Sequence, residues 1–207
     1  MAKLKAPLMS LGASGQLGKA LVFFPWKGLN VVREFVIPSN PQTTLQNAQR
    51  AWLRAAVIDI HLAEANATQP LDEIDTMAYA LWGSTYPTPR TWFNQAVKNW
   101  VDMARLTGKP AVYRGGSTGL GAGNLGVYIY SDRINAAGDC NVGWFYYGTS
   151  KTALINRIAA VMDWATNSAS ATIPGLTAGV KYFWQFRPDA GEPAVGALSG
   201  IYYGTPT

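Results

Sequence analysis

The sequence predicts an α+β protein of two domains, in which a β-hairpin with a small helical domain precedes an antiparallel β-sandwich. Two features of the chain indicate this order. Apolar residues recur at helical spacing between residues 40 and 106, whereas short β-rich runs separated by glycine-rich or polar turns follow residue 109. We therefore expect a flexible lead-in at 1–16, a hairpin with three helices at 17–108, and the sandwich at 109–207.

The lead-in contains the segment MSLGASGQLGKALV, whose glycines Gly12, Gly15 and Gly18 have the spacing of a dinucleotide-binding turn. Such a turn needs a buried strand before it and a helix after it, because the pyrophosphate binds at the helix N-terminus. Here the sequence PWKG at 25–28 predicts a turn instead, and Ala20 stands where a phosphate loop needs Ser or Thr. A nucleotide-dependent reductase is therefore the least favoured of three functional hypotheses.

The turn at 25–28 joins two apolar runs, which predicts a β-hairpin. Both faces of this hairpin are apolar, and a two-stranded ribbon alone is marginally stable in water. It must therefore be covered, either by the helices of its own chain or by a neighbouring subunit. The apolar residues concerned are Leu21, Val22, Phe23, Phe24, Val31, Val32, Phe35, Val36 and Ile37.

Three helices are expected after the hairpin, at about 40–65, 70–83 and 88–106. In the first, Leu45, Ala48, Trp52, Ala56 and Ile60 advance in steps of three and four, which predicts one apolar stripe. The second begins with three acidic residues, Asp72, Glu73 and Asp75, which we interpret as capping groups rather than as a catalytic carboxylate pair. The third has an aromatic apolar side that predicts a core between helices or between subunits.

The composition is that of a globular protein. The 207 residues are 48% hydrophobic and 14% charged, and the net charge of +5 is dispersed rather than gathered in a basic block. We therefore expect no specific nucleic-acid binding. No apolar run approaches the roughly 20 residues of a membrane helix, and no recognisable secretion signal is present, so no membrane contact is expected.

A single cysteine and a single histidine restrict the chemistry. Cys140 has no second cysteine for a disulfide or a cysteine-rich zinc site, and we interpret it as a small buried strand residue. His61 is interpreted as an interface or surface residue of the first helix. The sequence thus favours a protein that is not an enzyme, with no cofactor, metal ion or catalytic residue.

Strands of the sandwich are expected at 111–113, 125–130, 142–147, 170–173, 180–186 and 200–203. Within them, the segment ATIPGLTAGVKYFWQFR at 171–187 resembles the corner before the sixth strand of fibronectin type III domains. In that pattern a leucine, a glycine and a tyrosine recur at the spacing of Leu176, Gly179 and Tyr182. The resemblance implies that the Tyr182 hydroxyl closes the corner by bonding back to the backbone.

The N-terminal half resembles uncharacterised bacteriophage-type proteins. Those chains contain a hairpin whose pattern matches GKALVFFPWKGLNVVR at 18–33. A helix follows that begins like PSNPQTTLQ at 38–46, and a fibronectin-like tail domain is often present. The resemblance implies a virion structural component, such as a capsid-associated, decoration or tail-region protein, assembled in the host cytoplasm.

The leading hypothesis is therefore a structural protein that assembles with its own copies or with other virion proteins. We expect the contact residues to be Phe24, Trp26, Lys27, Arg33 and Trp52, since tryptophan and arginine are frequent at the energetic centres of interfaces. The second hypothesis is an extracellular module that binds a glycan or a cell surface, or a subunit of a cell-surface filament. Its aromatic residues would be Tyr128, Tyr130, Trp144, Tyr146, Tyr147, Tyr202 and Tyr203.

Overall fold

The computed structural model describes residues 3–4, 15–37, 39–40 and 42–207. Most of the predicted lead-in at 1–16, including Gly12, lies outside these residues. The chain divides into two compact units, residues 1–43 and residues 44–207. The α+β class is confirmed, but the division falls at 43/44 rather than at the expected 108/109.

The first unit contains an antiparallel sheet with the strand order β1-β4-β3-β2. Its strands are β1 (Lys3–Leu4), β2 (Gly15–Leu17), β3 (Leu21–Trp26) and β4 (Leu29–Glu34). Strands β3 and β4 form the predicted hairpin, and their pairing ends at Trp26 and Leu29. The two turn residues, Lys27 and Gly28, have φ angles of 48° and 76°, as hairpin turns matched to the twist of the strands require.

Two glycines of the glycine-rich segment, Gly15 and Gly18, are part of this sheet and its first turn. Gly15 lies in β2, and Gly18 lies in the turn that leads into β3, with φ angles of 107° and 57°. A strand therefore follows the turn where a pyrophosphate would need the N-terminus of a helix. The glycines allow a tight connection between antiparallel strands.

The second unit, every residue of which is described, begins with the helices α1 (Thr44–Glu64), α2 (Glu73–Gly83) and α3 (Trp92–Arg105). Helices α2 and α3 start later than expected because the residues before them, Asp72 and Thr91, are extended and cap the helix. The Asp72 carboxylate accepts a hydrogen bond from the Asp75 N–H, and the Asp75 carboxylate accepts one from the Asp72 N–H. The capping interpretation of these acidic residues is therefore confirmed.

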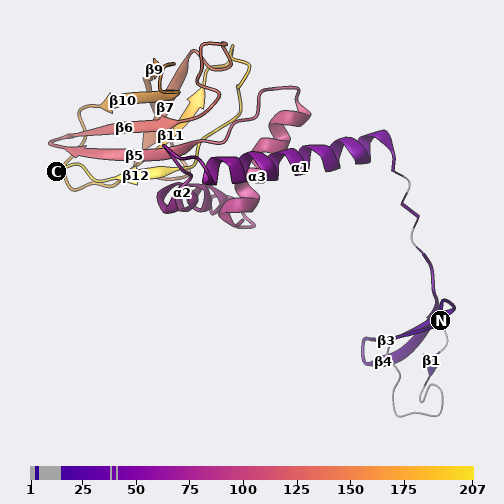
Figure 1. The fold of residues 1–207 in the computed structure, drawn as a ribbon. Helices are drawn as coiled ribbons and strands as arrows, with labels where there is room; N and C mark the ends of the chain where they lie inside the picture. Colours follow the sequence, from indigo (N-terminus) through magenta and orange to yellow (C-terminus); the bar gives the residue numbers. More distant parts are fainter. Residues whose placement is uncertain (1–2, 5–14, 38, 41) are drawn as a thin grey trace. The chain divides into compact units, whose positions relative to one another are not determined.

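Two antiparallel sheets follow the helices (Figure 1). One has the order β5-β6-β10-β9, with β5 (Arg114–Gly121), β6 (Asn124–Tyr130), β10 (Ser168–Ile173) and β9 (Val161–Asp163). The other has the order β12-β11-β7-β8, with β12 (Tyr202–Gly204), β11 (Tyr182–Pro188), β7 (Gly143–Gly148) and β8 (Asn156–Ala159).

Three details of the sheets differ from the expectation. No strand forms at 111–113 as expected, because the backbone N–H and C=O of Tyr113 bond the hydroxyl of Tyr79 instead of a neighbouring strand, and β5 follows at Arg114–Gly121. The strands β8 and β9 were not predicted, since each is mostly exposed and has one partly buried apolar side chain, Ile158 or Met162. That pattern is too short to be recognised as a strand.

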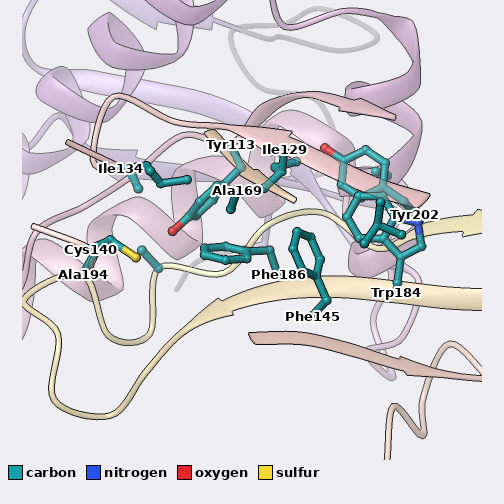
Figure 2. Close-up of a cluster of buried hydrophobic side chains, with 14 of the residues drawn as sticks. Tyr113, Ile129, Ile134, Cys140, Phe145, Ala169, Trp184, Phe186, Ala194 and Tyr202 are labelled. Atoms are coloured by element: carbon teal, nitrogen blue, oxygen red, sulfur yellow. The ribbon is translucent and has the colours of Figure 1, made fainter. Parts of the chain in front are cut away.

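The main core lies between the two sheets, where side chains that alternate along the strands meet (Figure 2). Trp184 stacks on Tyr202 at 4.4 Å between ring centroids, and its Nε1 donates to the Thr118 hydroxyl of the opposite sheet. Cys140 is buried as expected, but it lies in the loop between β6 and β7 rather than in a strand. Burial raises the pKa of its thiol to about 12.

Helix α2 is attached to the edges of both sheets by the buried carboxylate of Asp75. One oxygen accepts from the Gly116 N–H at 2.9 Å and from the Tyr202 hydroxyl at 2.7 Å. The other accepts from the Gly115 N–H at 2.7 Å and from the Asp72 N–H. Burial raises the pKa of Asp75, and the four hydrogen bonds act in the opposite direction. Together with apolar residues of the helices and the sandwich that pack in the same clusters, such as Ala78 and Ile201, these bonds hold the helices and the sandwich in one unit.

We expect Asp75→Asn to lower the free energy of unfolding by about 1 to 3 kcal/mol, although the two side chains have nearly the same shape. Each Asp75 oxygen accepts a backbone N–H, so either orientation of the amide places its NH₂ against one of those donors. Urea denaturation followed by far-UV circular dichroism measures the change. The control is Glu73→Gln, which alters an exposed carboxylate in the same helical turn. Equal stability of the two variants would contradict the role of Asp75.

Candidate functional site

The N-terminal sheet presents one continuous row of large side chains. In the register of the hairpin, Phe24 is opposite Val31 and Trp26 is opposite Leu29, so these four side chains lie on the same face. Trp26 is 56% exposed and Leu29 is 42% exposed. Arg33 belongs to this face too, and its guanidinium lies 5.4 Å from the centroid of the Phe24 ring. The structure thus brings together three of the five predicted contact residues.

The remaining two predicted contact residues lie elsewhere. Lys27 is exposed in the turn that ends the hairpin, next to Trp26. Trp52 is half-buried on α1, which belongs to the second unit. The N-terminal sheet is also apolar on its other face, where Phe23 is buried while Leu17 and Leu21 are exposed. Both faces of the hairpin are therefore apolar, as the sequence predicts.

Helix α1 carries a second exposed apolar surface. The predicted stripe is buried at Ala56 and Ile60, but Leu45 is 81% exposed. The 21 residues of α1 span about 31 Å, whereas the 14 residues of its partner α3 span about 21 Å. The N-terminal part of α1 consequently extends past the other helices (Figure 1). Other exposed apolar residues of this helix are Leu53, Ile58 and Leu62.

The corner residues of the sandwich lie together at the start of β11. The Tyr182 hydroxyl accepts a hydrogen bond of 3.2 Å from the backbone N–H of Thr177, five residues upstream. Gly179 has a φ angle of 75°, and its N–H donates to the carbonyl of Pro206. Leu176 is buried against the core. The hydroxyl therefore ties the corner to the strand in the way that the resemblance implies.

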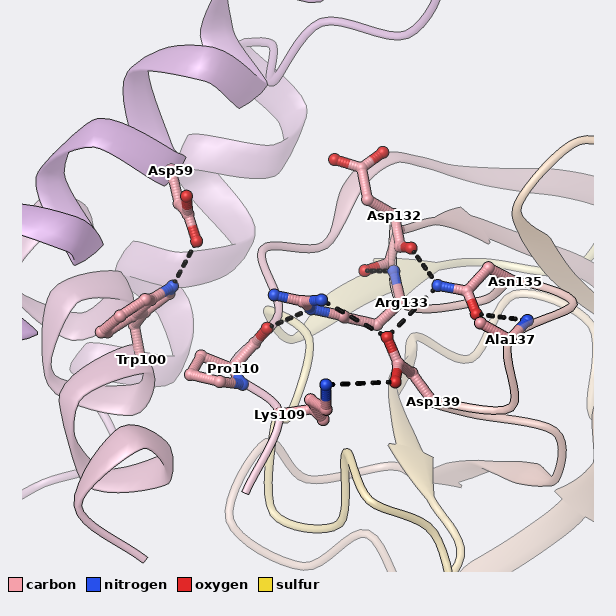
Figure 3. A network of polar contacts seen from close by, with 10 residues as sticks. Asp59, Trp100, Lys109, Pro110, Asp132, Arg133, Asn135, Ala137 and Asp139 are labelled. Carbon is pink, nitrogen blue, oxygen red and sulfur yellow. Dashed lines mark hydrogen bonds and ion pairs between the residues drawn. The ribbon is translucent and has the colours of Figure 1, made fainter. Parts of the chain in front are cut away.

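A polar network, not foreseen from the sequence, joins the segment after α3 to the loop between β6 and β7 (Figure 3). The Arg133 Nε donates to the Pro110 carbonyl at 2.8 Å, and Arg133 and Lys109 both form ion pairs with Asp139. On the helical side, the Trp100 Nε1 donates to Asp59 at 2.8 Å. These contacts join neighbouring segments of the second unit, and in them Arg133 and Lys109 are both paired with Asp139.

The aromatic residues considered for glycan binding are in three different environments. Tyr202 and Tyr147 pack in the main core, and Tyr202 also lines, with the exposed Tyr203, a pocket of about 620 Å³ whose other side chains are mostly apolar. Trp144 and Tyr146 lie under the guanidinium groups of Arg157 and Arg187, at 4.3 and 4.4 Å. The ring centroids of Tyr128 and Tyr130 are 4.7 Å apart, and both rings line a pocket of about 530 Å³. Gln69, Asp72 and Ser117 also line this pocket.

For the described part of the chain, no cluster of three or more histidine, cysteine or acidic side chains could hold a metal ion. None of the described helices has the length and apolarity needed to span a membrane. No protein family matches this chain, and no curated protein matches it in sequence.

We expect Tyr182→Phe to lower the free energy of unfolding by about 1 kcal/mol, because the Thr177 N–H loses its acceptor while the ring packing is retained. Thermal and urea unfolding measure this effect. The matched control is Tyr203→Phe in β12, whose hydroxyl forms no hydrogen bond with any described residue. A Tyr182→Phe protein as stable as the wild type would show that the corner bond contributes nothing.

Proposed function

We propose that this chain is a non-enzymatic structural protein of a virus particle, a capsid-associated, decoration or tail-region component that assembles through its N-terminal hairpin and helices. The observation that carries the proposal is the exposed face of the N-terminal sheet. Trp26 and Leu29 lie there beside Phe24 and Arg33, on a unit that is compact by itself.

Physical chemistry favours a protein partner for this face. A unit of some 40 residues can bury only a small core, so the exposure of large apolar side chains on it costs stability that an interface restores. Tryptophan and arginine contribute much of the binding energy at protein interfaces. The exposed half of α1, with Leu45, Leu53 and the half-buried Trp52, provides a second contact surface on the other unit.

The partners are further copies of this chain, other virion structural proteins, or both, and the location is the virion, assembled in the host cytoplasm. The resemblance of the N-terminal half to bacteriophage-type proteins implies this setting, and the exposed apolar faces support a role in assembly. Specific nucleic-acid or membrane binding is not part of the proposal.

We further propose that the sandwich is fibronectin type III-like. The order β5-β6-β10 in one sheet and β8-β7-β11-β12 in the other supports this assignment, as does the hydrogen bond to the Tyr182 hydroxyl. Two features are particular to this chain. The strand β9 extends the first sheet, and the buried core tryptophan, Trp184, lies on β11.

Assembly is tested by Trp26→Ala. We expect the oligomer or particle of the wild type to be lost while the melting temperature stays within a few degrees, because Trp26 is more than half exposed in the single chain. Light scattering coupled to size exclusion and negative-stain imaging measure assembly. The control is Trp164→Ala, which removes a tryptophan of similar exposure, 50% against 56% for Trp26, from the second unit. Wild-type protein that stays monomeric, or normal particles of the Trp26 variant, would refute the proposal.

The second candidate function is an extracellular glycan-binding or cell-surface-binding module, including a subunit of a cell-surface filament. The polar pocket beside Tyr128 and Tyr130 favours it, because two aromatic rings, an amide and a carboxylate suit the mixed polar and apolar surface of a sugar. The location would then be the extracellular surface.

A glycan array with the full chain tests this second function. We expect any glycan bound by the wild type to lose at least tenfold in affinity with Gln69→Ala, which removes an amide from the pocket. Gln49→Ala, an exposed substitution on α1, is the control. An array without binding, or equal losses for both variants, would exclude the pocket as a glycan site.

A further inference from the structure

The outer face of β11 holds a half-buried cation without an acidic partner. The Arg187 guanidinium stacks 4.4 Å above the Tyr146 ring, and its Nε donates to the Gln185 side-chain oxygen at 3.0 Å. The amide nitrogen of Gln185 donates to the Ser199 carbonyl, which fixes the orientation of that side chain. Among the described residues, no carboxylate forms an ion pair with Arg187.

Arg187 lines a pocket of about 220 Å³ together with a second cation, Lys151 of the loop between β7 and β8. The Lys151 ammonium donates to the Ser84 hydroxyl at 2.8 Å, which leaves two of its N–H groups for another acceptor. Thr85 and Thr152 add hydroxyl groups to the lining, and none of the residues that line this pocket is acidic. The pocket thus has two positive charges and no negative one.

This charge balance has a physical consequence. Partial burial of Arg187 removes water from the guanidinium, and it lowers the pKa of that group. Because a desolvated cation is unfavourable without a counter-charge, an anion in the pocket would compensate for part of that cost. The terminal nitrogens of the guanidinium form a planar fork that matches two oxygens of a carboxylate or a phosphate.

The dipole of helix α2 accounts for the presence of only one of the two cations, Lys151. The last turn of this helix contains no basic residue, so Lys151, bonded to the C-cap residue Ser84, provides a positive charge at the negative end of the helix dipole. Arg187 lies on β11 and has no such role.

We propose that this pocket is a binding site for an oxyanion, the carboxylate, phosphate or sulfate group of a ligand. Arg187 contributes the fork and Lys151 the second charge. The site goes beyond the proposed assembly function, because it lies in the second unit and shares no residue with the N-terminal sheet.

Isothermal titration calorimetry of the full chain tests the site, with sodium phosphate and sodium acetate as separate probes and sodium chloride of equal ionic strength as the reference. We expect saturable binding of at least one probe. Tighter binding of phosphate would assign the site to tetrahedral oxyanions, and tighter binding of acetate would assign it to carboxylates.

Variants identify the pocket as the place of binding. Arg187→Gln and Lys151→Gln should each weaken binding at least tenfold, whereas Arg157→Gln should change it less than twofold. Arg157 is a suitable control because its guanidinium also stacks on an aromatic residue of β7, Trp144, but lies outside the pocket lining. Circular dichroism verifies that each variant is folded, and if Arg187→Gln is not, Lys151→Gln decides alone. Binding no better than that of chloride, or an equal loss with Arg157→Gln, would overturn the proposal.

Discussion

The buried carboxylate of Asp75 is the interaction on which the arrangement of the second unit depends. Its two oxygens accept four hydrogen bonds, which come from the start of α2, from two consecutive glycines of β5 and from the Tyr202 hydroxyl on β12. A buried carboxylate is tolerated only when its oxygens are satisfied in this way. The glycines are required as well, because a side chain at Gly116 would collide with the Tyr202 ring. One acidic residue therefore fixes a helix against the edges of two sheets.

The surfaces of the second unit follow from this attachment. The polar pocket at the start of α2 includes Asp72 and the glycines beside Asp75, and the oxyanion pocket includes Trp82 and Thr85 near the end of the same helix. Both are junctions between a helix and a sheet rather than features of the sandwich alone. If α2 were detached, neither group of side chains would converge.

The first unit differs from the second in how much apolar surface it exposes. Its sheet is small and apolar on both faces, and its largest exposed side chain, Trp26, lies at the end of a tight turn. The second unit, by contrast, has its own cores of buried apolar side chains. The surface proposed for assembly therefore lies on the first unit, and the pockets proposed for ligands lie on the second.

Much of the local structure could be predicted from the sequence, because it depends on neighbouring residues. The hairpin follows from the turn at Lys27 and Gly28, the existence of three helices from their apolar spacing, and the corner from the spacing of Leu176, Gly179 and Tyr182. The second role of Asp75 could not be predicted, since its partners Gly115 and Tyr202 are 40 and 127 residues away along the chain. The same holds for the boundary at 43/44, the weakly patterned strands β8 and β9, and the meeting of Lys151 with Arg187. The sequence by itself determined the helices, the hairpin and most of the strands, and only the tertiary structure decided which distant polar groups meet, because burial and partners exist only once the chain is folded.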